Sequence, residues 1–219
     1  FVQVLTDPRP HPALWGTCGA YPDTYTLAAG MATSGAVTEW LRSLVDGDFA
    51  ELVQEAGTVP AGSRGLLLLP YFAGERTPIF DPDARGVLAG LTLRHGRAEL
   101  YRAALEGIGF GVRHNLEAMN AAGGRAQRLV AVGGGTQGGL WTQIVSDITG
   151  QEQQIPAEMI GAAYGDALLA GIATSTAVAV DDWNPVTRTV RPIPENTERY
   201  EAFYEHYRQL YDATARTAH

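Results

Sequence analysis

The sequence predicts an α/β fold in which short buried strands alternate with helices. Leu129–Val132 has the composition of a strand, residues 133–139 form a glycine-rich turn, and Leu140–Ile148 continues as a helix. A second unit follows, with a short strand at Gln153–Ile155 and a helix over Gly161–Ala173. Strand, glycine turn and helix in this order are typical of nucleotide-binding layouts. We therefore expect a mixed or largely parallel sheet with helices on both faces, and the glycine turn at the carboxyl end of its strand.

Further short strands are predicted before this region. Phe1–Leu5 has the pattern of a strand entered midway, so we expect residues upstream of it in the full protein. Tyr25–Leu27 is a second candidate. The apolar run Leu66–Leu69, closed by Pro70, suits a strand that is buried on both faces.

Three longer helices complete the prediction. One extends over Ser34–Val45 and ends at Asp46 and Gly47, a second extends over Ala98–Ala122, and a third extends over Glu195–Ala215. In the second helix, glycines lower the helix propensity, which indicates close approach of another element. These glycines are Gly107, Gly109 and Gly111. The third helix places an aromatic stripe on one face, as expected for a core or docking surface. Its members are Tyr200, Phe203, Tyr204, Tyr207, Leu210 and Tyr211.

Composition excludes several classes of protein. The 219 residues are 45% hydrophobic and 18% charged, which is enough for one or two compact lobes. A net charge of −8 and a pI near 5.1 argue against a nucleic-acid partner. Cys18, the single cysteine, is expected to be a small buried residue. No apolar run approaches the roughly 18 residues of a membrane helix, so we expect a cytoplasmic protein without a membrane partner.

The glycine-rich turn at residues 133–139 carries the clearest chemical signal. Its glycines allow backbone N–H groups to approach an anion or a flat base. It is neither a Walker A loop, because no Gly-Lys-Ser/Thr follows, nor a dinucleotide fingerprint with its acidic residue. A plain tight turn is the alternative from the residues alone.

Other catalytic patterns are missing. The histidines lack metal-ligand spacing and no cysteine pair accompanies them, so no metal site made only of protein ligands is expected. They are His11, His95, His114, His206 and His219. There is no Gly-x-Ser-x-Gly elbow for a hydrolase. The long loop over Tyr71–Gly96 is a functional candidate. Asp81 and Asp83 in this loop, and Asp166 farther along the chain, are expected to stabilise loops or helix caps.

Several motifs carry a family resemblance. Gly86–Leu91, followed after seven residues by Glu99–Glu106, resembles the second signature of the FGGY carbohydrate kinases. Leu68–Pro78 resembles the preceding loop of the pentulose kinases in that family. The Gly133–Gly135 turn followed by Trp141 resembles its adenosine motif, and Gly161–Ala167 and the terminal helix are also similar. The resemblance covers nearly the whole chain.

The resemblance implies a fold and an activity. The fold would be an actin-like ATPase domain of the ribonuclease H-like type, the carboxyl-terminal half of a two-domain sugar kinase. Residues 1–219 would then be the nucleotide-binding domain, incomplete at its amino terminus and without the sugar-binding domain. The activity would be ATP- and Mg²⁺-dependent phosphorylation of a sugar hydroxyl, with a pentulose such as xylulose or ribulose as substrate. The amino-terminal kinase domain is the expected partner, and a homodimer is left open.

The resemblance also assigns residues. Nucleotide contacts fall on Gly35 and Glu39 in the first helix region, and on Gly134, Gly135 and Gly138 in the turn. Helix packing is the alternative role of Gly35. Position 138 is often serine or asparagine in this family, so glycine here removes a side-chain hydrogen bond. The catalytic aspartate and the phosphate loop are expected upstream of Phe1, so the chain has no catalytic residue and is expected to be inactive alone.

Two other interpretations compete with this one. Another actin-like phosphotransferase, such as a relative of acetate kinase, is disfavoured by the second signature. A non-catalytic actin-like module that binds a nucleotide or a partner remains open, because a fold does not determine a function. The coding sequence upstream of Phe1 would discriminate between them.

Overall fold

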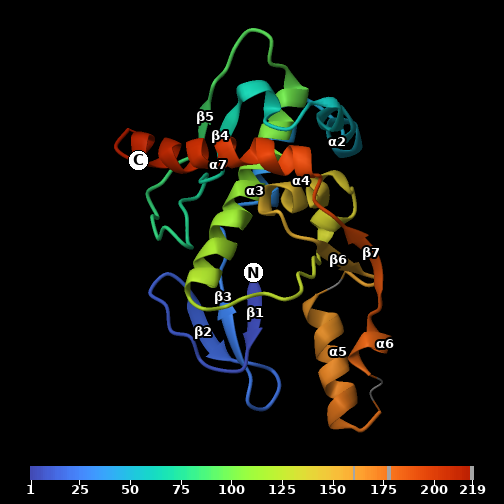
Figure 1. Cartoon of the computed structure of the whole chain (residues 1–219). Coiled ribbons are helices and arrows are strands. Elements are labelled where there is room, and N and C mark those ends of the chain that lie inside the picture. The colour runs from blue at the N-terminus through green and yellow to red at the C-terminus, as the bar shows by residue number, and fades with distance from the viewer. Residues whose placement is uncertain (160, 177–178, 218–219) are drawn as a thin grey trace.

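The chain forms a helical body with two extensions below it, one a β-sheet and the other a pair of helices, as Figure 1 shows. The structure, a computed structural model, describes residues 1–159, 161–176 and 179–217. Helices α1, α2, α3, α4 and α7 make the body, while the sheet β1–β3 and the pair α5 and α6 extend from it. His219 lies outside the described residues.

Helix α3, Arg97–Ala121, is the centre of the body. It packs against α1 (Gly35–Val45), α2 (Phe49–Thr58) and α4 (Leu140–Thr149). Glu99 stabilises its start, because the Glu99 Oε2 atom accepts a hydrogen bond from the Gly96 N–H at 2.9 Å. The long apolar stripe of α3 therefore has a partner on nearly every side.

The glycines of α3 confirm the predicted close approach. A Cβ at Gly107 would overlap the carbonyl oxygen of Leu68, so β4 lies directly against the helix backbone. At Gly109 a Cβ would lie 2.7 Å from the Ile148 Cδ1 atom of α4. The low helix propensity of these residues is offset by packing that no larger residue permits.

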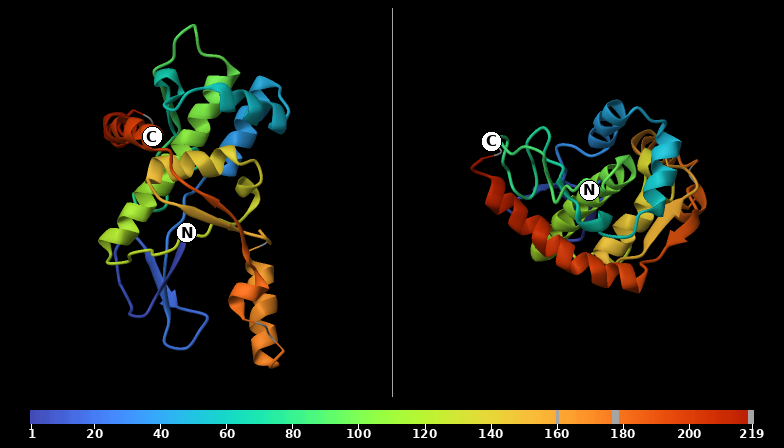
Figure 2. Two further views of the ribbon diagram at one scale, coloured as in Figure 1. Left: turned by 45° about the vertical axis from the view of Figure 1, so that its right-hand side comes forward. Right: turned by 90° about the horizontal axis from the view of Figure 1, so that it is seen from above.

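Helix α7, Pro194–Thr214, crosses the outside of the body and completes the core (Figure 2). Its aromatic stripe packs on the core, as predicted: Tyr200, Tyr204 and Tyr207 are buried, and the other three members are half-buried. The Tyr207 hydroxyl forms a hydrogen bond of 2.9 Å with the Tyr71 hydroxyl. Phe110 of α3 packs edge-on against Tyr200 and at a tilt against Tyr207, with ring centroids 5.8 and 5.4 Å apart.

The first sheet is antiparallel, with β3 in the middle. It consists of β1 (Val2–Leu5), β2 (Trp15–Cys18) and β3 (Tyr25–Ala28), in the order β1-β3-β2. Cys18 is exposed on the edge strand β2. The expectation that Cys18 is buried was wrong, because β2 has a free edge and all four of its residues are exposed.

Four further strands form two antiparallel pairs. The 3₁₀ helix η1 (Ser63–Gly65) leads into β4 (Leu67–Leu69), which pairs with β5 (Val87–Ala89) in antiparallel orientation. The predicted loop over 71–96 therefore contains a strand. β6 (Gln153–Pro156) pairs with β7 (Val186–Val190), and η2 (Gly134–Thr136), α5 (Ala162–Ala173) and α6 (Val180–Trp183) complete the fold.

The predicted parallel sheet is not formed. The described residues build three separate antiparallel sheets instead. Residues 129–132, predicted as a strand, form only one bridge, in which Val130 pairs with Gln154 in parallel orientation. A strand needs a continuous ladder, and this segment has a neighbour along one edge alone. The α/β class itself holds. No helix in the described part of the chain is both long and apolar enough to cross a bilayer.

Candidate functional site: a glycine-walled pocket

A pocket of about 330 Å³ lies where α1, α2, α3 and the glycine turn meet. Its walls are apolar on the helical side and formed by glycine on the other. The lining residues are Ser34, Gly35, Thr38, Phe49, Val53, Leu105, Ile108, Val132, Gly135, Gly138 and Trp141. Apolar walls with a few polar atoms at the rim are typical of ligand pockets.

The glycine turn has the backbone freedom that its composition predicted. Gly133 and Gly139 have φ angles of +99° and +74°, in the region that favours glycine. The turn is closed by hydrogen bonds from the Thr136 N–H to the Gly133 carbonyl, at 3.1 Å, and from the Gln137 N–H to the Gly134 carbonyl, at 3.3 Å. These hydrogen bonds hold the turn in one conformation at the pocket wall.

The pocket-facing glycines differ in what surrounds them. A Cβ at Gly35 would meet nothing within 4 Å, and one at Gly138 would meet only the Val53 Cγ1 atom, at 3.8 Å. At Gly135 a Cβ would lie 2.9 Å from the Trp141 Cε3 atom, so the indole ring covers this glycine. Side chains at Gly35 and Gly138 would thus enter the open pocket without disturbing the protein.

Sequence reasoning placed two residues at this site that do not line it. Glu39 is exposed on α1, and its Oε1 atom pairs with the Arg42 Nη2 atom at 2.6 Å. This hydrogen bond to Arg42 holds the pKa of the Glu39 carboxyl below its usual range. Gly134 precedes the lining residue Gly135, with open space around its Cα. The structure brings together Gly35, Gly135 and Gly138.

Helix α2 supplies lining residues that sequence reasoning missed. Phe49 and Val53 come from this helix, and Leu105 and Ile108 come from the neighbouring face of α3. A signal for α2 is present, because Asp48 caps it through a 2.7 Å hydrogen bond from the Ala50 N–H. Leu52 and Ala56 then recur at helical spacing on its buried face.

A buried polar network stabilises α3 behind the pocket. Glu106 accepts hydrogen bonds from the Arg102 Nε atom at 2.7 Å, the Tyr200 hydroxyl at 2.7 Å and the Ser63 hydroxyl at 2.7 Å. The network joins α3 to η1 and α7, so the positions of Leu105 and Ile108 depend on it. Buried charges of this kind persist only when they are paired.

The loop before β5 supports the start of α1. Glu75 Oε1 accepts hydrogen bonds from the Ala32 N–H at 2.8 Å and the Arg76 N–H at 2.7 Å. Thr77, fully buried, accepts at 2.8 Å from the Gly30 N–H. Burial raises the pKa of the Glu75 carboxyl. These contacts position the segment that leads into Gly35.

The described residues do not offer a metal centre or a free carboxylate at the pocket. No group of three or more His, Cys, Asp and Glu side chains in this part of the chain could hold a metal ion. Asp81 stabilises its loop, as predicted, because its Oδ1 atom accepts from the N–H groups of Asp83 and Ala84 at 3.0 and 3.1 Å. The Asp81 Oδ2 atom accepts from the Tyr211 hydroxyl at 2.6 Å.

Comparison with known proteins identifies the family. Residues 1–174 match the FGGY family of carbohydrate kinases, C-terminal domain. The chain belongs to the FGGY carbohydrate kinases. The fold is that of the carboxyl-terminal half of such a kinase, with the actin-like α/β architecture that the sequence predicted.

Individual FGGY kinases are similar to this chain in sequence and in structure. A xylulose kinase of Escherichia coli is 31% identical over 208 residues, which are 93% of this chain and 43% of that protein. A glycerol kinase of Cereibacter sphaeroides is 37% identical over 68% of this chain and 31% of its own length. The solved xylulose kinase of Rhodospirillum rubrum is 30% identical, with a TM-score of 0.88 over 98% of this chain and 45% of that chain. The chain therefore spans less than half the length of these relatives.

Proposed function

We propose that this chain is the nucleotide-binding part of a kinase that transfers a phosphoryl group from ATP to a sugar hydroxyl. The observation that carries the proposal is the glycine-walled pocket, in which Gly35, Gly135 and Gly138 meet. Glycine walls admit a flat base, and the apolar side chains of Phe49 and Trp141 suit its faces. The adenosine part of ATP would occupy this pocket.

The rim of the pocket supports a phosphate-bearing ligand. The glycine turn leads directly into α4, whose first turn has no side-chain cap and carries the partial positive charge of a helix N-terminus. An anionic group is stabilised at such a position. The Mg²⁺ that ATP carries has no ligand set among the described side chains, so this proposal assigns it none.

The favoured substrate is a pentulose such as xylulose. Two features support this: the loop Gly74–Pro78 resembles that of pentulose kinases, and a xylulose kinase is 31% identical over 93% of this chain. Comparing xylulose, ribulose and glycerol as acceptors in the full-length kinase tests the choice. A turnover highest with glycerol would contradict it.

Substitution of Gly138 tests the nucleotide site. Gly138→Leu places a large side chain in the pocket, and the nearest protein atom to its Cβ is 3.8 Å away, so the fold tolerates it. We expect ATP affinity, measured by calorimetric titration, to fall by about tenfold or more, while the melting temperature stays unchanged. Gly135→Val is a poorer test, because its Cβ would press on Trp141 and also disturb the fold.

A matched control separates pocket filling from general effects. Gly57 on α2 is exposed with nothing within 4 Å of its Cβ position, and it lines no described pocket. Gly57→Leu is expected to keep the ATP affinity of the unaltered chain. Equal ATP affinities for the Gly138 and Gly57 variants would show that this pocket does not bind the nucleotide.

A further inference from the structure

The glycine-walled pocket is exposed at one end and buried at the other. Its mouth is formed by exposed residues, namely Ser34, Gly35, Gly135 and Gly138. The lining residues that are buried lie at the closed end, and they are Thr38, Leu105 and Ile108. Among these three, Thr38 alone has a polar side chain. A ligand that fills the pocket therefore brings its innermost edge to Thr38.

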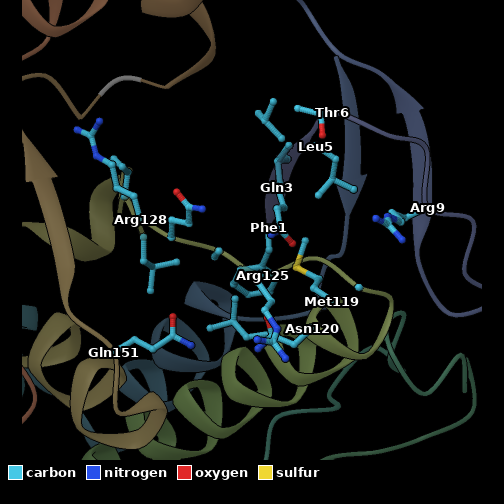
Figure 3. A pocket seen from close by; sticks show the side chains of 18 of the residues that line it. Phe1, Gln3, Leu5, Thr6, Arg9, Met119, Asn120, Arg125, Arg128 and Gln151 are labelled. Carbon is cyan, nitrogen blue, oxygen red and sulfur yellow. The ribbon is translucent and has the colours of Figure 1, made fainter. Parts of the chain in front are cut away.

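The larger cavity beside β1, of about 790 Å³, has the opposite distribution of polar groups (Figure 3). Its buried lining residues, Leu116 and Met119, are apolar, whereas the side chains of Arg9, Arg125 and Arg128 are exposed. A buried polar atom discriminates between ligands more strongly than an exposed one, because water cannot replace the bond that a wrong ligand fails to make. Of these two cavities, the glycine-walled pocket is the one with such an atom.

The hydroxyl of Thr38 has its proton engaged within α1. Its Oγ1 atom donates to the Gly35 carbonyl at 2.8 Å, three residues back in the helix. A hydroxyl has one proton to donate and two lone pairs that accept. With the proton directed at Gly35, the Thr38 oxygen can only accept hydrogen bonds from other groups.

The side chain of Tyr101 lies beside Thr38. It is fully buried, its ring packs edge-on against the lining residue Phe49 with centroids 6.4 Å apart, and its hydroxyl has no hydrogen-bond partner among the described residues. Burial raises the pKa of the Tyr101 hydroxyl, and its interaction with Thr38 opposes this shift. Tyr101 therefore keeps its proton and is a donor. It can occupy one lone pair of Thr38, and the other lone pair remains for a ligand.

A nucleotide in this pocket enters with one edge of its base first. In the proposed function its phosphates lie at the start of α4, beside the exposed mouth. The ring edge opposite to the ribose then faces the closed end. In adenine this edge carries the 6-amino group, which is a hydrogen-bond donor, and in guanine it carries an oxygen at the same ring position.

Building on the proposed function, we infer that Thr38 determines the base specificity of the site, because its oxygen accepts a hydrogen bond from the 6-amino group of adenine. A purine with an oxygen at position 6 would set two acceptors against each other. Leu105 and Ile108, the neighbours of Thr38 at the closed end, have no polar side-chain atom that could compensate. The mismatched oxygen would remain buried without a partner, which is unfavourable.

Three nucleotides that differ at position 6 of the base test the inference. ATP has an amino group there, purine riboside triphosphate has a hydrogen atom and ITP has an oxygen. Calorimetric titration of the chain measures the affinity for each. We expect ATP to bind about tenfold more tightly than purine riboside triphosphate, and ITP to bind no better than purine riboside triphosphate.

Substitutions at Thr38 connect this preference to one atom. Thr38→Val keeps the shape of the side chain but removes the acceptor, so ATP and purine riboside triphosphate should bind with equal affinity. Thr38→Ser keeps the hydroxyl and should keep the tenfold preference. Thr58→Val is the matched control, because the Thr58 hydroxyl also bonds three residues back, to the Glu55 carbonyl at 2.7 Å, but lines no described pocket. Its preference should equal that of the unaltered chain.

Three results would overturn the inference and leave the ATP site in place. The first is equal affinity of the unaltered chain for ATP and purine riboside triphosphate. The second is a preference for ATP that persists in Thr38→Val, and the third is ITP that binds as tightly as ATP, which would make Thr38 a donor. A chain that binds none of the three nucleotides would overturn the proposed function as well, so the two failures are distinguishable.

Discussion

At the scale of single residues, His114 is a side chain whose ionisation near neutral pH depends on the fold. It lies on α3 beside a cavity lined by Arg113, Glu117 and Arg208. Burial, with a smaller contribution from the positive charge of Arg208, lowers the pKa of His114 from 6.5 to about 4. Glu117 opposes this shift. The folded protein therefore favours the neutral imidazole.

This pKa shift predicts an acid-labile fold. Because the folded pKa lies below the unfolded value, the contribution of His114 to stability is complete above pH 6.5 and is lost as the pH falls toward 4. The loss is about 3 kcal/mol, at 1.36 kcal/mol per pKa unit over the shift from 6.5 to about 4. His114→Gln should flatten the dependence of unfolding free energy on pH in this range, as measured by urea unfolding. Equal pH slopes for both proteins would exclude His114 as the cause.

The family resemblance placed three of its five assigned residues on the candidate site. Gly35, Gly135 and Gly138 were chosen by resemblance, and the structure places them on one pocket. Glu39 was chosen in the same way, yet its position on α1 directs its carboxylate to Arg42. Which face of a helix meets a pocket depends on tertiary packing, and that is why the apolar lining from α2 and α3 could not be assigned from sequence.

At the scale of elements, the contact between α3 and β4 predicts that Gly107 does not tolerate substitution by a larger residue. Gly107→Ala would force a Cβ into the Leu68 carbonyl oxygen, which belongs to the backbone and cannot rotate away. We expect destabilisation of about 1–3 kcal/mol in thermal or urea unfolding, in spite of the higher helix propensity of alanine.

Gly57→Ala is the control for this prediction. Gly57 is exposed on α2 with open space at its Cβ position, so propensity alone acts there. Its variant should gain about 0.5–1 kcal/mol. If both alanine variants were stabilised, the close approach of β4 to α3 would be refuted.

Elements with long helical periodicity were predictable, and so were the short strands β1, β3, β4 and β6, but the strands β2, β5 and β7 were not. α1, α3, α4 and α7 match their predicted ranges to within about two residues, because each buries a repeated stripe and ends at a clear stop. β5 and β7 have no comparable signal in so few residues. The predicted strand at 129–132 has the right composition, but a strand is defined by its neighbours, and this segment pairs along one side only, through the bridge of Val130 to Gln154.

At the scale of the whole molecule, we predict that the chain alone has no sugar kinase activity. Phosphoryl transfer needs a base for the sugar hydroxyl and closure around both substrates. The described residues offer no free carboxylate at the pocket, and the chain covers 43% of the xylulose kinase of Escherichia coli. A coupled assay with xylulose and ribulose should show no turnover above a mock purification. Turnover that co-elutes with the chain would contradict the assignment of the catalytic residue to the rest of the kinase.

The position of α7 in the chain has a consequence for biosynthesis. The core residues Tyr200, Tyr204 and Tyr207 are translated after the elements that they cover, and Tyr207 bonds to Tyr71 across a separation of 136 residues. At ribosomal rates of roughly 5–20 residues per second, Tyr207 is synthesised on the order of ten seconds after Tyr71. During that interval the aromatic face of α3 has no cover. A nascent chain of this protein therefore exposes apolar core surface until α7 leaves the ribosome.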